Sequence, residues 1–104
     1  RPITENDIWV DDSASIQYNR WVTLPTDAGS YEIMKRADGL YDLGAVIEYN
    51  TGPVVPGLGS AIFIHIWRDE GQKPTAGCVA LDRQHLHYLL EWLKADMAPE
   101  IILF

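Results

Sequence analysis

The sequence predicts a small, mainly β domain that carries one amphipathic helix. Two apolar stretches rich in β-forming residues, 40–49 and 60–66, are bounded by turns rich in glycine and proline. A single stretch, 83–96, has leucines at spacings of three and four, which is typical of a helix with one buried face. The first 38 residues keep neither period for long, so they predict short extended pieces joined by loops.

In chain order, the first element is the segment "DIWVDDSASIQYNRWVTLP", in which we expect short strands that stop at Pro25. Next comes a strand over Leu40–Tyr49, which begins and ends on turn residues. The segment "GPVVPGLGS" should be a loop because it holds five prolines and glycines that interrupt regular structure. "SAIFIHI" then predicts a strand that is covered on both faces.

The second half continues with the polar loop "WRDEGQKP" and a short apolar stretch, "TAGCVAL". Asp82 is a good N-cap for the helix that follows it. Pro99 should end this helix at the latest, and "EIILF" predicts a terminal strand. We find no repeat or linker, so the 104 residues predict a single domain.

Charge and composition exclude several classes of partner. The formal net charge is −7, which argues against nucleic acid and anionic lipid. No apolar run approaches the roughly 20 residues of a membrane span. The chain shows no signal segment, and its start at Arg1-Pro2 indicates processing or a fragment of something longer. His85 and His87 are two positions apart on different helix faces, so we expect no metal site, and no cofactor motif is present.

The single cysteine and an upstream histidine are the candidate catalytic pair. Cys78 and His65 are 13 positions apart, at the ends of two apolar segments that could form adjacent strands. An imidazole beside a thiol either removes its proton or, as imidazolium, lowers the thiol pKa. Gly77 would let backbone amides approach a substrate and stabilise an oxyanion. Spacing alone slightly favours the alternative, in which Cys78 and His65 simply pack in the core.

Together, "GSAIFIHIW" and "TAGCVAL" resemble the catalytic core of the L,D-transpeptidase family, the YkuD-like enzymes of peptidoglycan. The family motif is a strand histidine followed by Ser/Thr-x-Gly-Cys, which Thr75, Gly77 and Cys78 match. Looser similarity extends over most of the chain and resembles the C-terminal two-thirds of the family domain. Ala76 departs from the histidine that many members carry there, which puts substrate preference in question.

The resemblance implies a cysteine acyltransferase in the bacterial cell envelope, periplasmic or otherwise extracytoplasmic, that serves cell-wall biogenesis. Cys78 would form a thioester with a peptidoglycan stem peptide, release a terminal D-alanine and pass the peptide to an amine. His65 would be the base, oriented by the backbone carbonyl of Ile66 or, alternatively, by the side chain of Asp69, and the amides of Gly77 and Cys78 would be oxyanion donors. Transfer to water would instead make the chain an L,D-carboxypeptidase-like hydrolase, and a non-catalytic peptidoglycan-binding or assembly module is the other alternative.

The resemblance also implies a substrate-binding set and an overall architecture. The set consists of Thr75, of Trp67 and Arg68 beyond the histidine strand, and of Tyr18 and Asn19 in an upstream loop. Arg68 would meet a peptide carboxylate. The implied fold is an L,D-transpeptidase-like β-sandwich or barrel whose N-terminal strands lie outside this chain. A missing N-terminal segment or a second chain would then complete the sheet.

Overall fold

Two small sheets and one helix make up the fold in the computed structural model, which describes residues 1–102. The first sheet has the order β2-β1-β3, and its strands are β1 (Asp7–Val10), β2 (Arg20–Thr23) and β3 (Tyr31–Ile33). The second has the order β4-β5-β6, with β4 (Gly44–Val46), β5 (Phe63–Ile66) and β6 (Val79–Leu81). The helix α1 (Arg83–Trp92) follows, and two short 3₁₀ turns are η1 (Asp69–Gly71) and η2 (Ala95–Met97). The fold class is therefore mainly β with one helix, as the sequence predicts, whereas the sandwich or barrel arrangement stays a prediction.

The first sheet is antiparallel and is built around β1, whose four residues are all buried. Side chains alternate across a strand, so Trp9 faces one side while Ile8 and Val10 face the other. Trp9 is paired with Trp21 of β2 and with Glu32 of β3. These three side chains therefore form one row across the same face of the sheet.

The second sheet is mixed, with β5 in the middle. β4 runs antiparallel to β5, whereas β6 runs parallel to it in the register Ile64↔Val79, His65↔Ala80 and Ile66↔Leu81. The prediction that the histidine and cysteine segments lie next to each other is thus confirmed. The chain returns from β5 to β6 through the loop 67–78, which contains η1.

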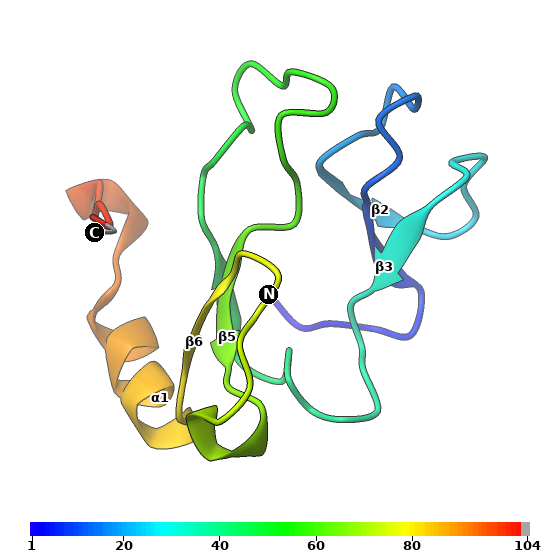
Figure 1. The fold of residues 1–104 in the computed structure, drawn as a ribbon. Helices are drawn as coiled ribbons and strands as arrows, with labels where there is room; N and C mark the ends of the chain where they lie inside the picture. The colour runs from blue at the N-terminus through cyan, green and yellow to red at the C-terminus, as the bar shows by residue number, and fades with distance from the viewer. Residues whose placement is uncertain (103–104) are drawn as a thin grey trace.

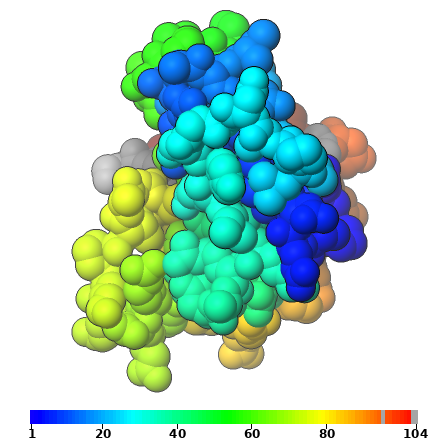
Figure 2. Space-filling model, turned by 90° about the vertical axis from the view of Figure 1, so that its right-hand side faces the viewer, coloured from blue at the N-terminus to red at the C-terminus, as the bar shows by residue number. Residues whose placement is uncertain are grey.

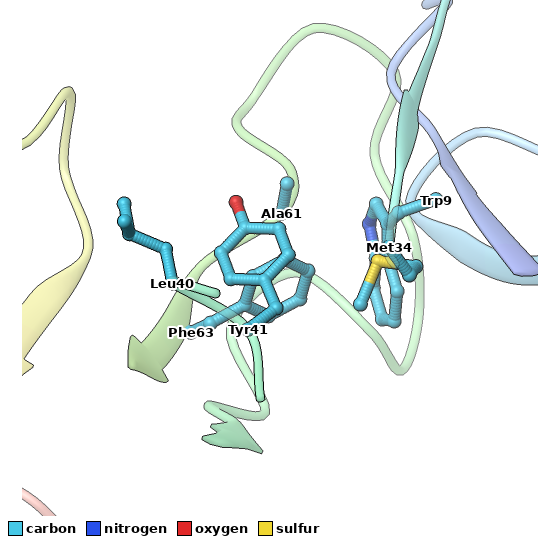
Figure 3. Packing of buried hydrophobic residues seen from close by; sticks show 6 residues of the cluster. All are labelled: Trp9, Met34, Leu40, Tyr41, Ala61 and Phe63. Atoms are coloured by element: carbon cyan, nitrogen blue, oxygen red, sulfur yellow. The ribbon is translucent and has the colours of Figure 1, made fainter. Parts of the chain in front are cut away.

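An aromatic cluster joins the two sheets. The ring of Phe63 in β5 meets Trp9 and Tyr41 edge-to-face, at centroid separations of 5.0 and 5.4 Å. Figure 3 shows Met34 beside Trp9, and Leu40 and Tyr41 on the Phe63 side. Edge-to-face pairs add about 0.5–1.5 kcal/mol each to the stabilisation from burial. Cys78 packs against this cluster, so the core also supports the candidate site.

The helix begins where the sequence predicts. Asp82 is its N-cap and accepts a hydrogen bond from the His85 backbone N–H at 2.9 Å. Leu86 is fully buried, and α1 contacts β4 and β5 on the side away from the first sheet (Figure 1). None of the helices in residues 1–102 has the length and apolarity needed to cross a membrane.

Two predicted strands differ from the structure. Within 40–49 only β4 is extended, because the chain turns at 40–43 and places Leu40 and Tyr41 in the core. The prediction of a terminal strand is wrong for residues 100–102, which pair with no strand and in which Ile101 and Ile102 are exposed. Residues 103–104 of that prediction lie outside the described residues.

Candidate active site

The strand register places the cysteine and the histidine on one face of the second sheet. His65 shares the face of Phe63, two positions earlier in β5, and is paired with Ala80. Cys78 immediately precedes β6, two positions before Ala80, and lines the same pocket as His65. From the usual strand spacing and rise, the Cβ atoms of such diagonal neighbours are about 8 Å apart. Their side chains can therefore meet above the sheet.

Both side chains line one pocket of about 630 Å³ between the two halves of the molecule. Asp11 and Glu32, from the first sheet and its connections, supply acidic groups to it. Arg68 and Lys73, from the loop 67–78, supply basic groups. In Figure 2 the yellow-green surface of this loop faces the cyan-to-teal surface of residues 31–45 across the hollow. The pocket thus offers charges of both signs around a thiol.

His65 is held in a defined orientation. It is 5% exposed, and its Nδ1 lies 2.7 Å from the backbone oxygen of Ile66. Because a carbonyl oxygen only accepts hydrogen bonds, Nδ1 carries the proton in the neutral ring, and Nε2 is left as the proton acceptor. Tyr41 meets the ring at a centroid separation of 5.5 Å. The contact expected between His65 and Ile66 is present, and its orienting role stays a proposal.

Cys78 rests as a neutral thiol against the chain before β5. Its Sγ donates to the backbone oxygen of Ala61 at 3.2 Å and accepts from the Phe63 N–H at 3.4 Å. Burial raises the pKa of the Cys78 thiol, the Phe63 N–H lowers it, and the charge of Glu32 raises it further. The net direction is upward, so the resting site favours a thiol over a preformed thiolate–imidazolium pair.

The turn before Cys78 is closed by the Thr75 hydroxyl. Thr75 Oγ1 donates to the Cys78 backbone oxygen at 2.6 Å and accepts from the Gly77 N–H at 3.2 Å. Gly77 has φ +143, a region that side-chain-bearing residues rarely adopt. The Gly77 N–H is therefore occupied in this structure, and its role as an oxyanion donor stays a prediction. The Cys78 N–H is the other expected donor.

Tyr18 and Asn19 do not line the pocket. Asn19 is 2% exposed; its Oδ1 accepts from Trp9 Nε1 at 2.9 Å and from the Ala61 N–H at 3.1 Å. Its Nδ2 donates to the backbone oxygens of Tyr49 and Asn50. The Tyr18 hydroxyl accepts from the Gly59 N–H at 3.1 Å. These bonds hold the loop that carries Ala61, so the geometry supports a structural role, and substrate contact by this pair stays a prediction without support from it.

Trp67 and Arg68, the two residues that follow β5, differ in their position relative to the pocket. Arg68 lines the pocket, as a substrate-side residue should. Trp67 does not line the pocket. Its backbone N–H donates to the Leu81 backbone oxygen, and its indole ring lies over Gly71. Of the predicted site residues, the pocket thus brings together His65, Arg68, Thr75, Gly77 and Cys78.

Sequence reasoning missed Glu32, Tyr41 and Ala61, which all line the same pocket. The sequence gives no signal for Glu32, since a charge between Tyr31 and Ile33 is the ordinary alternation of a half-buried strand. Nothing in the sequence marks Ala61, whose φ of +56 is unusual for a residue with a side chain.

A buried histidine on β5 and a cysteine that immediately precedes the neighbouring β6 line one pocket of a mainly β chain, and they form the kind of site that thiol acyl-transfer enzymes use. The YkuD family, described as the L,D-transpeptidase catalytic domain, matches residues 2–102, and the chain belongs to this family. No curated protein and no solved structure matches the chain. Membership indicates L,D-transpeptidase-type activity on peptidoglycan, and proteins of the family generally act on the cell wall outside the cytoplasm.

Proposed function

We propose that this chain is a cysteine acyltransferase that cross-links peptidoglycan stem peptides, with Cys78 as nucleophile and His65 as base. The observation that carries the proposal is that His65 of β5 and Cys78, the residue just before the neighbouring β6, line one pocket, and that Nδ1 of His65 bonds to the Ile66 backbone oxygen. Family membership supplies the substrate class, and the pocket supplies the residues.

In the first half-reaction, Cys78 Sγ attacks the carbonyl of the diaminopimelate residue that precedes the terminal D-alanine. Because the resting thiol is neutral, its proton passes to Nε2 of His65 as the C–S bond forms. The Cys78 N–H donates to the oxygen that becomes negatively charged. The C–N bond to D-alanine then breaks, and the imidazolium returns its proton to the leaving amine. The products are free D-alanine and a thioester on Cys78.

In the second half-reaction, the amine of another stem peptide attacks the thioester. His65 removes a proton from the amine as the new C–N bond forms, the C–S bond breaks, and the proton returns to the Cys78 sulfur. Attack by water at the same carbon would release the free acid, and the site would act as a carboxypeptidase. The choice between the two acceptors therefore decides whether the chain cross-links or trims.

Arg68 is the residue that we place against a carboxylate of the donor peptide, because it is exposed and lines the pocket. Thr75 acts by shaping the turn that presents Cys78, through its bonds to both ends of that turn. We place this reaction in the cell envelope outside the cytoplasm, where the substrate of the family lies.

Incubation with tetrapeptide muropeptides tests the proposal directly. We expect release of D-alanine and, by mass spectrometry of the intact protein, a thioester adduct on Cys78. Cys78→Ala should abolish both, and His65→Ala should slow both by at least about 100-fold, the usual contribution of a general base. His87→Ala is the matched control, because His87 is exposed on α1 and lies outside the pocket.

Product analysis with and without an acceptor amine separates the remaining functions. A cross-linked product supports the transpeptidase, whereas the free tripeptide alone indicates a hydrolase. Muropeptide binding that survives Cys78→Ala, with no turnover by the native chain, would identify a non-catalytic binding module and overturn the proposal.

A further inference from the structure

The strand β3 presents its side chains in an unusual order. Tyr31 and Ile33 are 41% and 56% exposed, whereas Glu32, the charged residue between them, points toward the interior. The register pairs Glu32 with Trp9, so its carboxylate shares the face that looks onto the second sheet. An apolar-out, charge-in strand costs stability and is typical of a functional position.

The carboxylate of Glu32 is held at one oxygen only. The Tyr41 hydroxyl donates to Oε1 at 3.2 Å, and the same tyrosine ring contacts the ring of His65. Burial, followed by the charge of Glu32, raises the pKa of Tyr41, so this hydroxyl remains a donor at any physiological pH. Tyr41 thereby places the carboxylate in the same pocket as His65 and Cys78.

No cation forms a direct ion pair with Glu32 in the part of the chain that the structure describes. Arg36 lines the same pocket, but its Nε and Nη2 both bond to the carboxylate of Asp38, at 2.9 and 2.6 Å. The other ion pairs found within residues 1–102 do not include Glu32 either. Glu32 therefore makes no direct ion pair within residues 1–102, although its charge contributes to raising the pKa of Arg36.

This carboxylate also works against the nucleophile. Its charge adds to burial in raising the pKa of the Cys78 thiol. A group that disfavours the thiolate would be a liability in the pocket unless it served another step, and a carboxylate without a direct ion pair among the described residues indicates that this step is the binding of a cationic group.

We infer that Glu32 binds the primary ammonium group of a peptidoglycan stem peptide, while Tyr41 fixes the carboxylate that receives it. The inference rests on the proposed function for its substrate class. An ammonium has three donors and the free Oε2 accepts, so the pair forms charge-assisted hydrogen bonds. Diaminopimelate supplies this ammonium in the donor peptide, and the attacking stem supplies it before deprotonation. Arg68, which lines the same pocket, then serves the carboxylate.

Binding without turnover is the first test. Calorimetry with the Cys78→Ala protein compares a tetrapeptide muropeptide bearing its free amine with the same peptide acetylated at that amine. If the donor ammonium is the ligand, Glu32→Gln in this background should weaken binding of the free-amine peptide by about 10- to 100-fold, the range for hydrogen bonds between charged groups. Binding of the acetylated peptide should be unchanged, since it has no charge to lose. If Glu32 has only a structural role, Glu32→Gln should weaken the binding of both peptides equally.

Turnover is the second test, made with Glu32→Gln in the otherwise native chain. If the acceptor ammonium is the ligand, the thioester on Cys78 should form at the native rate, while its transfer to an added amine falls by about 10- to 100-fold relative to hydrolysis. Glu5→Gln is the matched control, because Glu5 is exposed, lies outside the pocket and loses the same charge.

The two proposals fail in different ways. Equal binding and equal transfer by Glu32→Gln and Glu5→Gln would overturn the ammonium site, whatever the enzyme does with its thioester. The ammonium site would also be overturned if Glu32→Gln weakened binding of the acetylated peptide as much as binding of the free-amine peptide. Absence of a thioester in the native chain, with ammonium-dependent binding retained, would overturn acyl transfer and leave the ammonium site supported.

Discussion

Replacement of Asn19 by alanine should be among the most destabilising single changes in the chain. The side chain is 2% exposed and makes four hydrogen bonds, to Trp9, Ala61, Tyr49 and Asn50. Its loss leaves two buried donors, Trp9 Nε1–H and the Ala61 N–H, without acceptors. Each such orphan costs about 1–3 kcal/mol, so we expect a loss of about 3 kcal/mol from these two groups.

Asn50→Ala is the matched control for this change. Asn50 has the same φ of +56 and also bonds to backbone through its side chain, but its partners lie in the exposed loop 50–59. Both variants therefore share the cost of alanine in the left-handed region, about 1–2 kcal/mol, and the difference between them isolates the buried bonds.

Urea unfolding followed by circular dichroism measures that difference. With an m-value of about 1–3 kcal/mol/M, Asn19→Ala should unfold about 1–3 M earlier than Asn50→Ala, with the same slope. A difference below 0.3 M, which is about a tenth of the largest shift expected from these m-values, would refute the reasoning that burial decides the cost.

Three further predictions concern ionisation and backbone strain. The rate of iodoacetamide alkylation of Cys78 should rise with pH, with an apparent pKa above the usual value of about 8.5, because burial raises the pKa of this thiol. Glu32→Gln should lower the apparent pKa, since the charge of Glu32 also raises it. An apparent pKa below about 8.5 in the native chain would contradict a resting neutral thiol. Gly77→Ala should lower the free energy of unfolding by about 1–3 kcal/mol, measured by calorimetry, because its φ is +143. Crowding is not the cause, since the new Cβ would meet only Ile62 Cδ1, at 3.8 Å. Gly52→Ala, whose Cβ would meet nothing within 4 Å, should cost less. Finally, the Arg36 guanidinium lowers the pKa of Asp38 to about 2; because the folded pKa lies below the unfolded value of about 3.9, this stabilisation is complete above that value and is lost as pH falls toward 2. Melting temperatures between pH 2 and 6 should therefore fall less steeply for Asp38→Asn than for the native chain.

The sequence was sufficient to predict local features. The N-cap at Asp82 and the adjacency of the segments that carry His65 and Cys78 follow from spacings within a short stretch of chain. The Thr75 hydroxyl that occupies the Gly77 N–H was also predictable, since threonine commonly bonds to a backbone two residues on.

Features that depend on distant packing could not be predicted. Asn19 looks like an ordinary turn residue in sequence, because its partners Tyr49, Asn50 and Ala61 are 30 to 42 positions away. The prediction of a strand over 40–49 was wrong for the same reason, because Leu40 and Tyr41 lie in a turn and pack in the aromatic core instead of continuing the strand. The charge of the pocket depends on Glu32, whose importance emerges only when the two sheets face each other.

The parallel pairing of β5 with β6 has a consequence for the order in which parts of the chain can assemble. The His65–Cys78 segment closes over only 13 positions, whereas the Asn19–Ala61 hydrogen bond closes a loop of 42. Loop-closure entropy makes the longer connection costlier by about 1 kcal/mol. The proposed nucleophile and base therefore belong to one short stretch of polypeptide, and Asn19, together with the aromatic cluster, connects this stretch to the rest of the molecule.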